Sequence, residues 1–359
     1  MAKKMRVGIN GYGVIGKRVA DAVRLQPDMD LIGVSDVLSD YRVATAAGNG
    51  IPLYASTPES SAQMSAAGIS VAGGLPDLLN AIDVVVDCTP AGIGAENLEH
   101  YRSRGVKAIF QGGEKHTLTG HSFVAHANFA AAVGRDTTRV VSCNTTSTVR
   151  TLTALKNTGL LAKARGVLIR RATDPWESDH SGIMNTIVPE RKIPSHQGPD
   201  AQSVDPDLDV VTMAAKGAHT QNHLHYWVVE LTRSVARDDV LEALRACSRI
   251  AFVRESDGVV APNSTIELMR DLGRPRGDMY EVALWEDILT VDGTELYYSY
   301  TVDNQAIVIP ENIDAIRAVT GTIVDAAESI RLTDATLGIR RNFLPEAREV
   351  PSESSTATR

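Results

Sequence analysis

The segment Arg6–Gly16, which reads RVGINGYGVIG, decides the fold of this chain. Its first five residues have the apolar character of a buried strand, and apolar spacing predicts a helix over about Lys17–Leu25. Between them, Gly11 permits a tight turn, Gly13 lets the backbone approach a diphosphate, and Gly16 allows the helix to pack closely on the sheet. A GxGxxG turn between a strand and a helix predicts a dinucleotide-binding site, in which N–H groups at the start of the helix hold the diphosphate.

Three further strands are predicted in the first half of the chain, at Leu31–Ser35, Ile82–Asp87 and Ala108–Phe110. Because helical patterns separate them, they predict a parallel, doubly wound sheet. Asp36 directly follows the second strand, where its carboxylate would accept hydrogen bonds from the adenosine ribose and repel a 2′-phosphate. This favours NAD over NADP, although Asp36 could also be an ordinary turn residue. The nearby Arg42 could neutralise a 2′-phosphate, so NADP stays open.

The composition favours an intracellular enzyme with two domains. The chain has 359 residues, enough for two cores, and its net charge of -8 argues against a surface dedicated to nucleic acid or anionic membranes. Its three cysteines form neither a disulfide framework nor a C-x-x-C metal motif, which fits a reducing cytoplasm. No apolar run reaches the length of a membrane span. We expect the segment 41–65 to be irregular and the residues from Leu344 onward to be disordered.

The segment Ser142–Thr146, with the sequence SCNTT, is the strongest candidate for chemistry. A strand is predicted to end at Val141 and a helix to cover Ser147–Leu161, so Cys143 lies near the amino end of a helix. The helix dipole and unpaired N–H groups lower the pKa of a thiol, which favours a nucleophilic thiolate. Cys143 could equally be a small buried hydrophobic residue. Asn144 could steady an oxyanion or serve as the helix N-cap.

The two other cysteines have simpler explanations. Cys88 follows a predicted strand, and we expect it to be a buried neighbour of the cofactor crevice. Cys247 lies in the helical pattern Asp239–Arg249, and we expect it in the core.

The base that serves such a thiol should be a histidine with a pKa near neutrality. His219, His223 and His225 cluster before a predicted strand at Tyr226–Leu231. His223 and His225 are two residues apart, so on an extended segment they share one face. An H-x-H pair is also part of many metal sites, but no third ligand of fitting spacing is present, and we expect no metal.

Eight blocks of sequence, in order between about Arg6 and about Arg331, resemble the archaeal-type (type II) phosphorylating glyceraldehyde-3-phosphate dehydrogenases. The blocks are Gly8–Arg18, Asp87–Pro90, Phe110–Lys115, Ser142–Thr146, Pro194–His196, Gly198–Asp200, Asp271–Pro275 and Pro310–Arg317. Several are long and unusual, so chance agreement does not account for them. The segment Asp334–Arg359 is not part of the family pattern.

The resemblance implies an α/β fold with two domains. An N-terminal Rossmann domain with a doubly wound parallel sheet would cover 1–141, and a catalytic α/β domain with a mixed or antiparallel sheet would cover 142–306. A long helix within 307–333 would return to the Rossmann domain, and Glu311–Leu332 has the matching apolar spacing. Residues 334–359 would be an extension, in part disordered. The family assembles as homotetramers.

The resemblance also implies a reaction, in which D-glyceraldehyde 3-phosphate, inorganic phosphate and NAD(P)+ give 1,3-bisphosphoglycerate and NAD(P)H. Cys143 would attack the aldehyde to form a thiohemiacetal, hydride transfer would leave a thioester, and phosphate would release the acyl phosphate. His223 would be the base, with His225 as the alternative and His219 incidental. Such an enzyme serves glycolysis or gluconeogenesis in the cytoplasm.

The family also assigns contacts to residues of this chain. The implied cofactor contacts are Gly11, Gly13, Val14, Ile15, Gly16, Asp36, Gly112, Gly113, Arg171 and Gln305. The implied substrate contacts are Ser142, Asn144, Thr145, His196 and Gln197. Gln197 stands where the family often has a second histidine, although an amide can still donate to phosphate. Without the family context, Arg170 and Arg171 would be interpreted as members of surface ion pairs.

Two other functions were weighed against this one. A related semialdehyde dehydrogenase of the aspartate-semialdehyde type shares the Rossmann and thiolate plan, but a different sequence around the cysteine is expected there. A redox-sensing or nucleic-acid-binding paralogue would keep the fold. The acidic charge speaks against nucleic acid, and the pair Cys143 and His223 speaks against an inactive enzyme.

Overall fold

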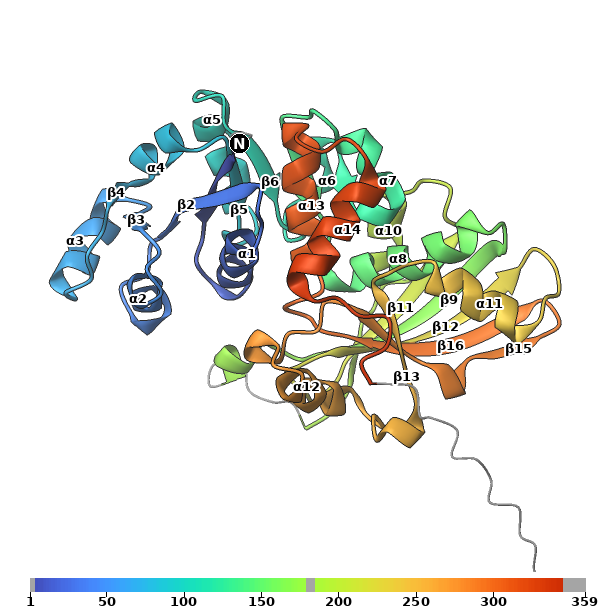
Figure 1. The fold of residues 1–359 in the computed structure, drawn as a ribbon. Helices are drawn as coiled ribbons and strands as arrows, with labels where there is room; N and C mark the ends of the chain where they lie inside the picture. Colours follow the sequence, from blue (N-terminus) through green and yellow to red (C-terminus); the bar gives the residue numbers. More distant parts are fainter. Residues whose placement is uncertain (1–3, 179–184, 345–359) are drawn as a thin grey trace, which may run out of the picture.

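The computed structural model describes residues 4–178 and 185–344, which form two eight-stranded sheets with helices packed on them (Figure 1). The first sheet is parallel throughout, with the strand order β4-β3-β2-β1-β5-β6-β8-β7. Its strands are β1 (Met5–Asn10), β2 (Met29–Asp36), β3 (Leu53–Ala55), β4 (Gly73–Gly74), β5 (Val84–Asp87), β6 (Lys107–Phe110), β7 (Ser122–Phe123) and β8 (Thr137–Val140). Its helices are α1 (Val14–Arg24), α2 (Tyr41–Gly48), α3 (Pro58–Ala66), α4 (Leu75–Ala81), α5 (Ile93–Arg102), α6 (His116–Thr119) and α7 (Ala125–Ala132). The predicted doubly wound parallel sheet is confirmed.

The second sheet is mixed, with the order β10-β11-β9-β12-β16-β14-β13 and β15 paired to β16. Its strands are β9 (Leu161–Arg170), β10 (Val188–Pro189), β11 (Val210–Lys216), β12 (His223–Leu231), β13 (Ile250–Val253), β14 (Val282–Trp285), β15 (Thr290–Asp292) and β16 (Glu295–Val302). The helices of this half are α8 (Cys143–Asn157), α10 (Gln197–Gln202), α11 (Arg237–Arg245) and α12 (Pro262–Asp271). The α/β class with a mixed second sheet is therefore confirmed as well.

The topology brings the ends of several strands to one place. The order of the first sheet reverses at β1, which lies between β2 and β5, and ligands of open parallel sheets bind outside the carboxyl ends of the strands at such a point. Gly11 follows β1, Asp36 ends β2, and Cys143 comes three residues after the end of β8. The glycine turn, the acidic residue and the thiol are therefore carried on one edge of the sheet.

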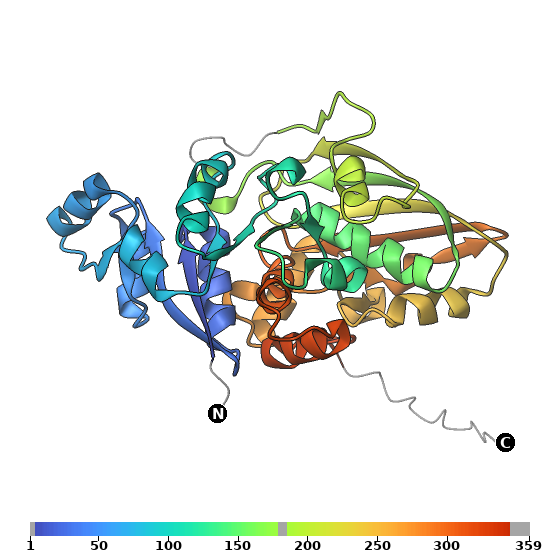
Figure 2. The ribbon, with the colours of Figure 1, turned by 90° about the horizontal axis from the view of Figure 1, so that it is seen from above.

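The carboxyl-terminal part of the described chain packs between the two halves. Two helices, α13 (Ile309–Thr320) and α14 (Ala326–Leu337), are drawn in red between the two sheets in Figures 1 and 2. The helix α13 contacts α1 and α7, and its residues 309–319 are all buried. The return to the first sheet occurs, but a single long helix was the wrong prediction. Gly321 has φ +68°, which ends α13 in a left-handed conformation, and the Asp325 side chain caps a new helix by accepting from the N–H of Glu328.

Four smaller expectations also need correction. The segment 41–65 is not irregular, because it contains α2, β3 and most of α3, with Asp40 and Thr57 as side-chain N-caps. Cys247 is buried as predicted, but it lies beyond the end of α11 at Arg245. Cys88 packs beside the core but is only partly buried. The predicted extension at 334–359 begins inside α14, and its residues 345–359 lie outside the described chain.

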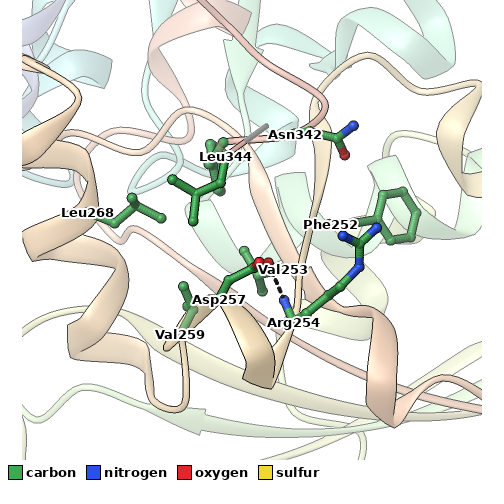
Figure 3. Close-up of a pocket in the computed structure, with 9 residues that line it drawn as sticks. Phe252, Val253, Arg254, Asp257, Val259, Leu268, Asn342 and Leu344 are labelled. Carbon is green, nitrogen blue, oxygen red and sulfur yellow. Dashed lines mark hydrogen bonds between the residues drawn. The ribbon is translucent and has the colours of Figure 1, made fainter. Parts of the chain in front are cut away.

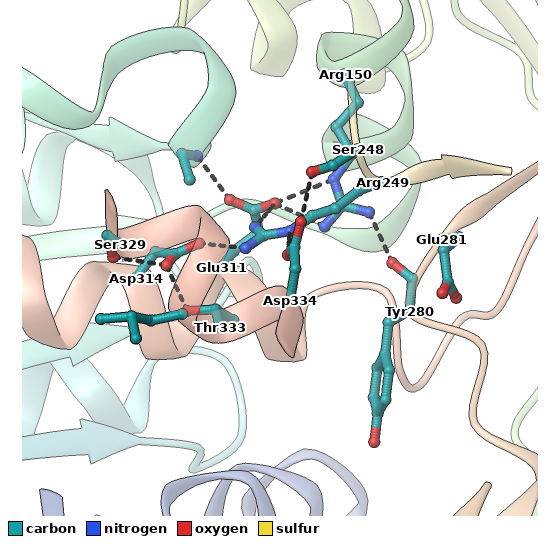
Figure 4. A network of polar contacts seen from close by, with 12 residues as sticks. Arg150, Ser248, Arg249, Tyr280, Glu281, Glu311, Asp314, Ser329, Thr333 and Asp334 are labelled. Atoms are coloured by element: carbon teal, nitrogen blue, oxygen red, sulfur yellow. Dashed lines mark hydrogen bonds and ion pairs between the residues drawn. The ribbon is translucent and has the colours of Figure 1, made fainter. Parts of the chain in front are cut away.

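A buried network of ions ties α8 to these last helices (Figure 4). Arg150, on α8, lies 2.6 Å from the carboxylate of Glu311, and Arg249 pairs with the same carboxylate at 3.1 Å. Arg249 also pairs with Asp314 at 2.5 Å and with Asp334 at 2.8 Å. Both arginine side chains are fully buried, and each lies in contact with at least one carboxylate of the network. The network holds α8, which carries Cys143, against the helices that separate the two sheets.

Candidate active site

The glycine turn after β1 is shaped for close backbone approach. Gly11 has φ +93°, and a Cβ on it would lie 2.8 Å from the backbone of Cys88. A Cβ on Gly16 would lie 1.9 Å from the carbonyl oxygen of Gly11, so the helix can approach the turn only with glycine there. A Cβ on Gly13 would meet no atom within 4 Å, so that side of the turn is open. The N–H groups of Val14 and Ile15, at the start of α1, have no partners inside the helix. This turn fits a diphosphate.

Asp36 is buried at the end of β2, where its carboxylate holds the glycine turn. One oxygen accepts from the N–H of Tyr12 at 2.7 Å, and the other accepts from the N–H groups of Val37 and Leu38. A carboxylate oxygen can accept more than one hydrogen bond, so a ribose hydroxyl can still bind there. Arg42 pairs with Asp40 at 2.5 Å, which neutralises much of the charge that a 2′-phosphate would meet.

The thiol of Cys143 lies at the first residue of α8, with Ser142 in the N-cap position. A Cβ on Gly112 would lie only 2.4 Å from the backbone nitrogen of Ser142, so the loop after β6 packs directly on the residue before the thiol. Cys143 Sγ is 3.3 Å from Nε2 of His223, the first residue of β12. The structure therefore places the predicted nucleophile and the predicted base in contact.

The tautomer of His223 follows from its second nitrogen. Nδ1 accepts a hydrogen bond of 3.0 Å from the backbone N–H of Arg171, so Nδ1 carries no proton in that arrangement. The proton of the neutral ring is then on Nε2, which donates toward the sulfur of Cys143. Arg171, predicted to contact the cofactor, thus has a second role in this structure as the residue that orients the histidine.

Burial of the thiol opposes the thiolate that a place at a helix start favours. Burial raises the pKa of Cys143 to about 11, although Arg171 and the backbone N–H of Asn144 oppose the shift. Burial also lowers the pKa of His223 well below its usual range, as do the nearby His225 and Arg171. Burial therefore disfavours the charged form of each group.

His225 and His219 do not touch the sulfur. His225 is fully buried, and its Nε2 is 2.8 Å from Oδ1 of Asn144. His219 Nε2 instead contacts the carbonyl oxygen of Asn222 at 3.1 Å. Asn144 is not the N-cap of α8, because Ser142 holds that position and Asn144 lies inside the first turn. The capping alternative for Asn144 is therefore wrong.

A chain of hydrogen bonds joins the glycine turn to His223 through a residue that the motifs did not reveal. Arg18, on α1, donates to Oε1 of Gln305 at 2.9 Å, and Gln305 donates to Asp174 at 3.1 Å. Asp174 also accepts from the side chain of Arg171 at 2.8 Å. Gln305 and Arg171, both predicted cofactor contacts, thus share Asp174 as an acceptor. Asp174 lies in no recognisable motif, and only its position three residues after Arg171 hinted at an ion pair.

The predicted substrate residues lie on two elements. On α8, Thr145 donates to Asp200 at 2.8 Å and lies 3.0 Å from the hydroxyl of Ser142. On the side of α10, Gln197 is fully buried, its Nε2 lies 3.1 Å from Nε2 of His196, and its Oε1 has no partner. An unpaired buried amide oxygen beside an exposed imidazole suits a polar ligand. His196 itself is exposed and lies 3.5 Å from Glu190.

Three negative findings limit what this site and the rest of the described chain can hold. Among residues 4–178 and 185–344, no three His, Cys, Asp or Glu side chains gather as they would around a metal ion, and no described helix is both long and apolar enough for a bilayer. The small pocket in Figure 3, between β13 and the segment 342–344, contains none of the predicted site residues. Arg170 forms an ion pair with Glu190 at 2.9 Å, as was expected for it without the family context.

Comparison with known proteins agrees with this geometry. Residues 142–287 match the family described as glyceraldehyde 3-phosphate dehydrogenase, C-terminal domain, and residues 5–145 match that described as dihydrodipicolinate reductase, N-terminus. The glyceraldehyde-3-phosphate dehydrogenase of Methanobrevibacter smithii is 46% identical over 93% of this chain and 99% of its own length. Those of Thermococcus kodakarensis and Metallosphaera sedula are 45% and 44% identical over 94% and 95% of this chain and 99% of their own lengths. The chain belongs to the glyceraldehyde-3-phosphate dehydrogenase family and is an NAD(P)-dependent oxidoreductase.

Proposed function

We propose that the chain oxidises D-glyceraldehyde 3-phosphate to 1,3-bisphosphoglycerate, with inorganic phosphate as second substrate and Cys143 as the nucleophile. The observation that carries the proposal is the 3.3 Å contact between Cys143 Sγ and His223 Nε2 at the carboxyl edge of the first sheet. The relatives that match over nearly their whole length are glyceraldehyde-3-phosphate dehydrogenases by name, which does not favour the semialdehyde alternative.

The proposed reaction begins when the thiol of Cys143 gives its proton to a base from solvent, a water or hydroxide, because Nε2 of His223 already carries a proton. The thiolate then accepts the Nε2–H of His223 and attacks the aldehyde carbon, and the carbonyl oxygen becomes the oxyanion of a thiohemiacetal. Bound NAD(P)+ supplies the acceptor for the hydride that leaves this carbon. The resulting thioester stays on Cys143 until phosphate attacks it, which releases the acyl phosphate and restores the thiolate. Ser142 and Thr145 can donate to a bound anion once they give up their contacts with each other and with Asp200.

His223 is proposed to serve in two ways. As a neutral ring with its proton on Nε2, it steadies first the sulfur and then the oxyanion. Where the thiohemiacetal oxygen carries a proton, His223 is the base that removes it, and the hydrogen bond from Arg171 to Nδ1 must then be given up. The matched control is His219, which contacts Asn222 and not the sulfur. His223→Ala should lower the rate of hydride transfer far more than His219→Ala.

The decisive measurement is the initial rate of NAD(P)H formation with D-glyceraldehyde 3-phosphate, with and without phosphate. We expect steady turnover with phosphate and one burst per active site without it, because the thioester would then persist. Reduction of the cofactor by aspartate semialdehyde and phosphate, with none from glyceraldehyde 3-phosphate, would overturn the proposal.

For the cofactor, we propose that Asp36 favours NAD by facing the ribose. Asp36→Gly should raise the kcat/KM ratio of NADP to NAD by about tenfold, since one charge repulsion of about 1.4 kcal/mol is removed. Because Asp36 also holds the N–H of Tyr12, Asp36→Asn is the companion variant that keeps an acceptor there. If the kcat/KM ratio of NADP to NAD were unchanged in both variants, Asp36 would not determine the choice of cofactor.

We also propose a homotetramer in the cytoplasm, with the open face of the second sheet as one contact surface. On that face Met213, Val167 and Tyr226 are adjacent across β11, β9 and β12, and each is more than one-third exposed. Val228 and Tyr297 continue the apolar row. Exposed apolar rows of this kind mark protein contacts. Tyr226→Asp should shift the sedimentation of the protein toward smaller species. A parent protein that sediments as a monomer would contradict the proposal.

A further inference from the structure

The side chain of Asn144, the residue after the nucleophile, is held by a buried pair of aromatic groups. Its Oδ1 is 2.8 Å from Nε2 of His225, and Nδ1 of the same histidine is 2.9 Å from the hydroxyl of Tyr300. The rings of His225 and Tyr300 pack with centroids 4.7 Å apart, and both side chains are fully buried. The hydrogen bond of Cys143 goes to His223 and not to either of these rings.

The direction of these hydrogen bonds follows from the amide oxygen of Asn144, which can only accept and therefore needs the proton of the neutral ring on Nε2 of His225. The Tyr300 hydroxyl is placed to donate to Nδ1 of His225 at 2.9 Å or to the Ser147 hydroxyl at 3.3 Å, and its single proton goes to Nδ1, which has none of its own. The ring proton of His225 is then on Nε2, which donates to Oδ1 of Asn144. Burial lowers the pKa of His225 to about 3, with Arg170 adding to the shift, so the ring stays neutral at ordinary pH.

The other end of the Asn144 amide is left without a partner. Within residues 4–178 and 185–344, no acceptor bonds to Nδ2, and this atom is not among the fully enclosed polar atoms that lack partners. The amide NH2 therefore faces a space that solvent reaches, although the residue as a whole is only 4% exposed. Because His225 is hydrogen-bonded to the amide oxygen, the amide group cannot rotate by 180° without breaking this buried hydrogen bond.

We propose that His225, supported by Tyr300, is a positioning residue that fixes the amide of Asn144 so that its NH2 donates to the oxyanion formed when Cys143 attacks the aldehyde. No proton is transferred in this arrangement. The NH2 donates a hydrogen bond to the oxygen while the C–S bond forms and keeps it until the hydride leaves. This inference rests on the proposed role of Cys143, and it gives the second histidine of the H-x-H pair a task apart from that of His223.

The test is a double-mutant cycle between Asn144→Ala and His225→Phe, with single-turnover formation of NADH as the readout. Each single variant should lower this rate by about 100-fold, the usual effect of losing one oxyanion donor. In the Asn144→Ala background, His225→Phe should cost less than about threefold more, since the histidine acts only through the amide. His225→Gln, which keeps a donor toward Oδ1, should recover part of the rate.

Two controls separate positioning from a general structural effect. Tyr300→Phe should lower the rate by about tenfold, one missing hydrogen bond of about 1.4 kcal/mol, whereas Tyr298→Phe should not change it. Tyr298 is the matched control because it stacks on Tyr300 and donates to Thr151 instead of to His225. The pH profile of Cys143 alkylation should be the same in all these variants, because the sulfur is partnered by His223.

Losses that multiply in the double variant would overturn the inference, as would a shift of the alkylation profile in His225→Gln. Failure of the proposed function looks different. If Cys143→Ser still oxidised glyceraldehyde 3-phosphate, the nucleophile itself would be wrong; if that variant were inactive while Asn144→Ala kept the parent rate, only the positioning inference would fail.

Discussion

The first and third turns of α8 differ in how their polar groups are satisfied. In the first turn, the thiol of Cys143 has one histidine contact, and the amide NH2 of Asn144 has no partner among the described residues. In the third turn, the guanidinium of Arg150 donates to Glu311 and to the carbonyl oxygens of Tyr280 and Ile307. One helix thus carries reactive groups with unused capacity at its start and, at Arg150, a buried charge whose three nitrogens all donate. Stability resides in the second set, and chemistry in the first.

The pKa values of two buried acids express the same contrast. Burial raises the pKa of Cys143 to about 11, because the cationic neighbours are too weakly coupled to reverse it. Burial would also raise the pKa of Glu311, but the guanidiniums of Arg150 and Arg249 lower it to about 2. Burial decides the direction of the shift at Cys143, and the two adjacent opposite charges decide it at Glu311.

The largest effect should come from the first turn. Cys143→Ser should lower kcat by at least about 1,000-fold, because the hydroxyl is a far weaker nucleophile than a thiolate. The melting temperature and the binding of NAD should stay close to those of the parent, since the sulfur is not part of the ion network. The checks are steady-state rates, calorimetry and NAD titration. Activity within tenfold of the parent, or a large loss of stability, would contradict the separation of the two turns.

The reverse result is expected from the ion network. Arg249→Met leaves Glu311, Asp314 and Asp334 with one cation fewer, and breaking a buried pair in this way costs about 3–5 kcal/mol of unfolding free energy. Urea unfolding measures the loss, and kcat of the remaining folded protein should stay within about threefold. The matched control is Arg245→Met, since Arg245 is exposed and its ion pair with Glu286 should contribute at most about 1 kcal/mol. Equal losses in the two variants would contradict the network.

How much of this could be predicted from sequence depends on the kind of signal. The glycine turn was predictable because each glycine answers a backbone requirement that leaves a fixed spacing, as the blocked Cβ positions of Gly11 and Gly16 show. Cys143 and His223 were named as candidates because their residue types are rare and chemically distinctive. The partners Asp174 and Tyr300 were missed, since a lone carboxylate after β9 and a lone hydroxyl on β16 belong to no motif and give no local pattern.

The direction of the Cys143 pKa shift was also out of reach. A helix start predicts a lowered pKa, but how completely the surrounding chain removes water from the sulfur depends on tertiary packing. The single long helix at 311–332 was wrong for a related reason. Apolar spacing continues across the break, and only the left-handed φ of Gly321 in the folded chain ends the first helix there.

The dependence of stability on acid pH tests the buried ion network through its carboxylate Glu311. The pKa of Glu311 is about 2 in the folded chain against the usual 4.5, so its contribution is present above about pH 4.5 and is lost as the pH falls toward 2. The loss should be on the order of 3 kcal/mol between these limits. Urea unfolding at pH 6 and pH 3 measures it, and Glu311→Gln should reduce the difference. A parent protein whose stability rises on acidification would show that the carboxylate is not held charged.

The smallest change per step, about tenfold in rate for each pH unit, is expected for alkylation of Cys143. Only the thiolate reacts, and with a pKa of about 11 its fraction should grow tenfold per unit from pH 7 to pH 10 without a plateau. Iodoacetamide kinetics in a background with both Cys88→Ser and Cys247→Ser isolate this thiol, because burial also raises the pKa of these two cysteines and their reactions would overlap. A plateau below pH 8 would mean that Cys143 and His223 form an ion pair before substrate binds. The first turn of α8 would then be compensated like the third, and the contrast between them would be lost.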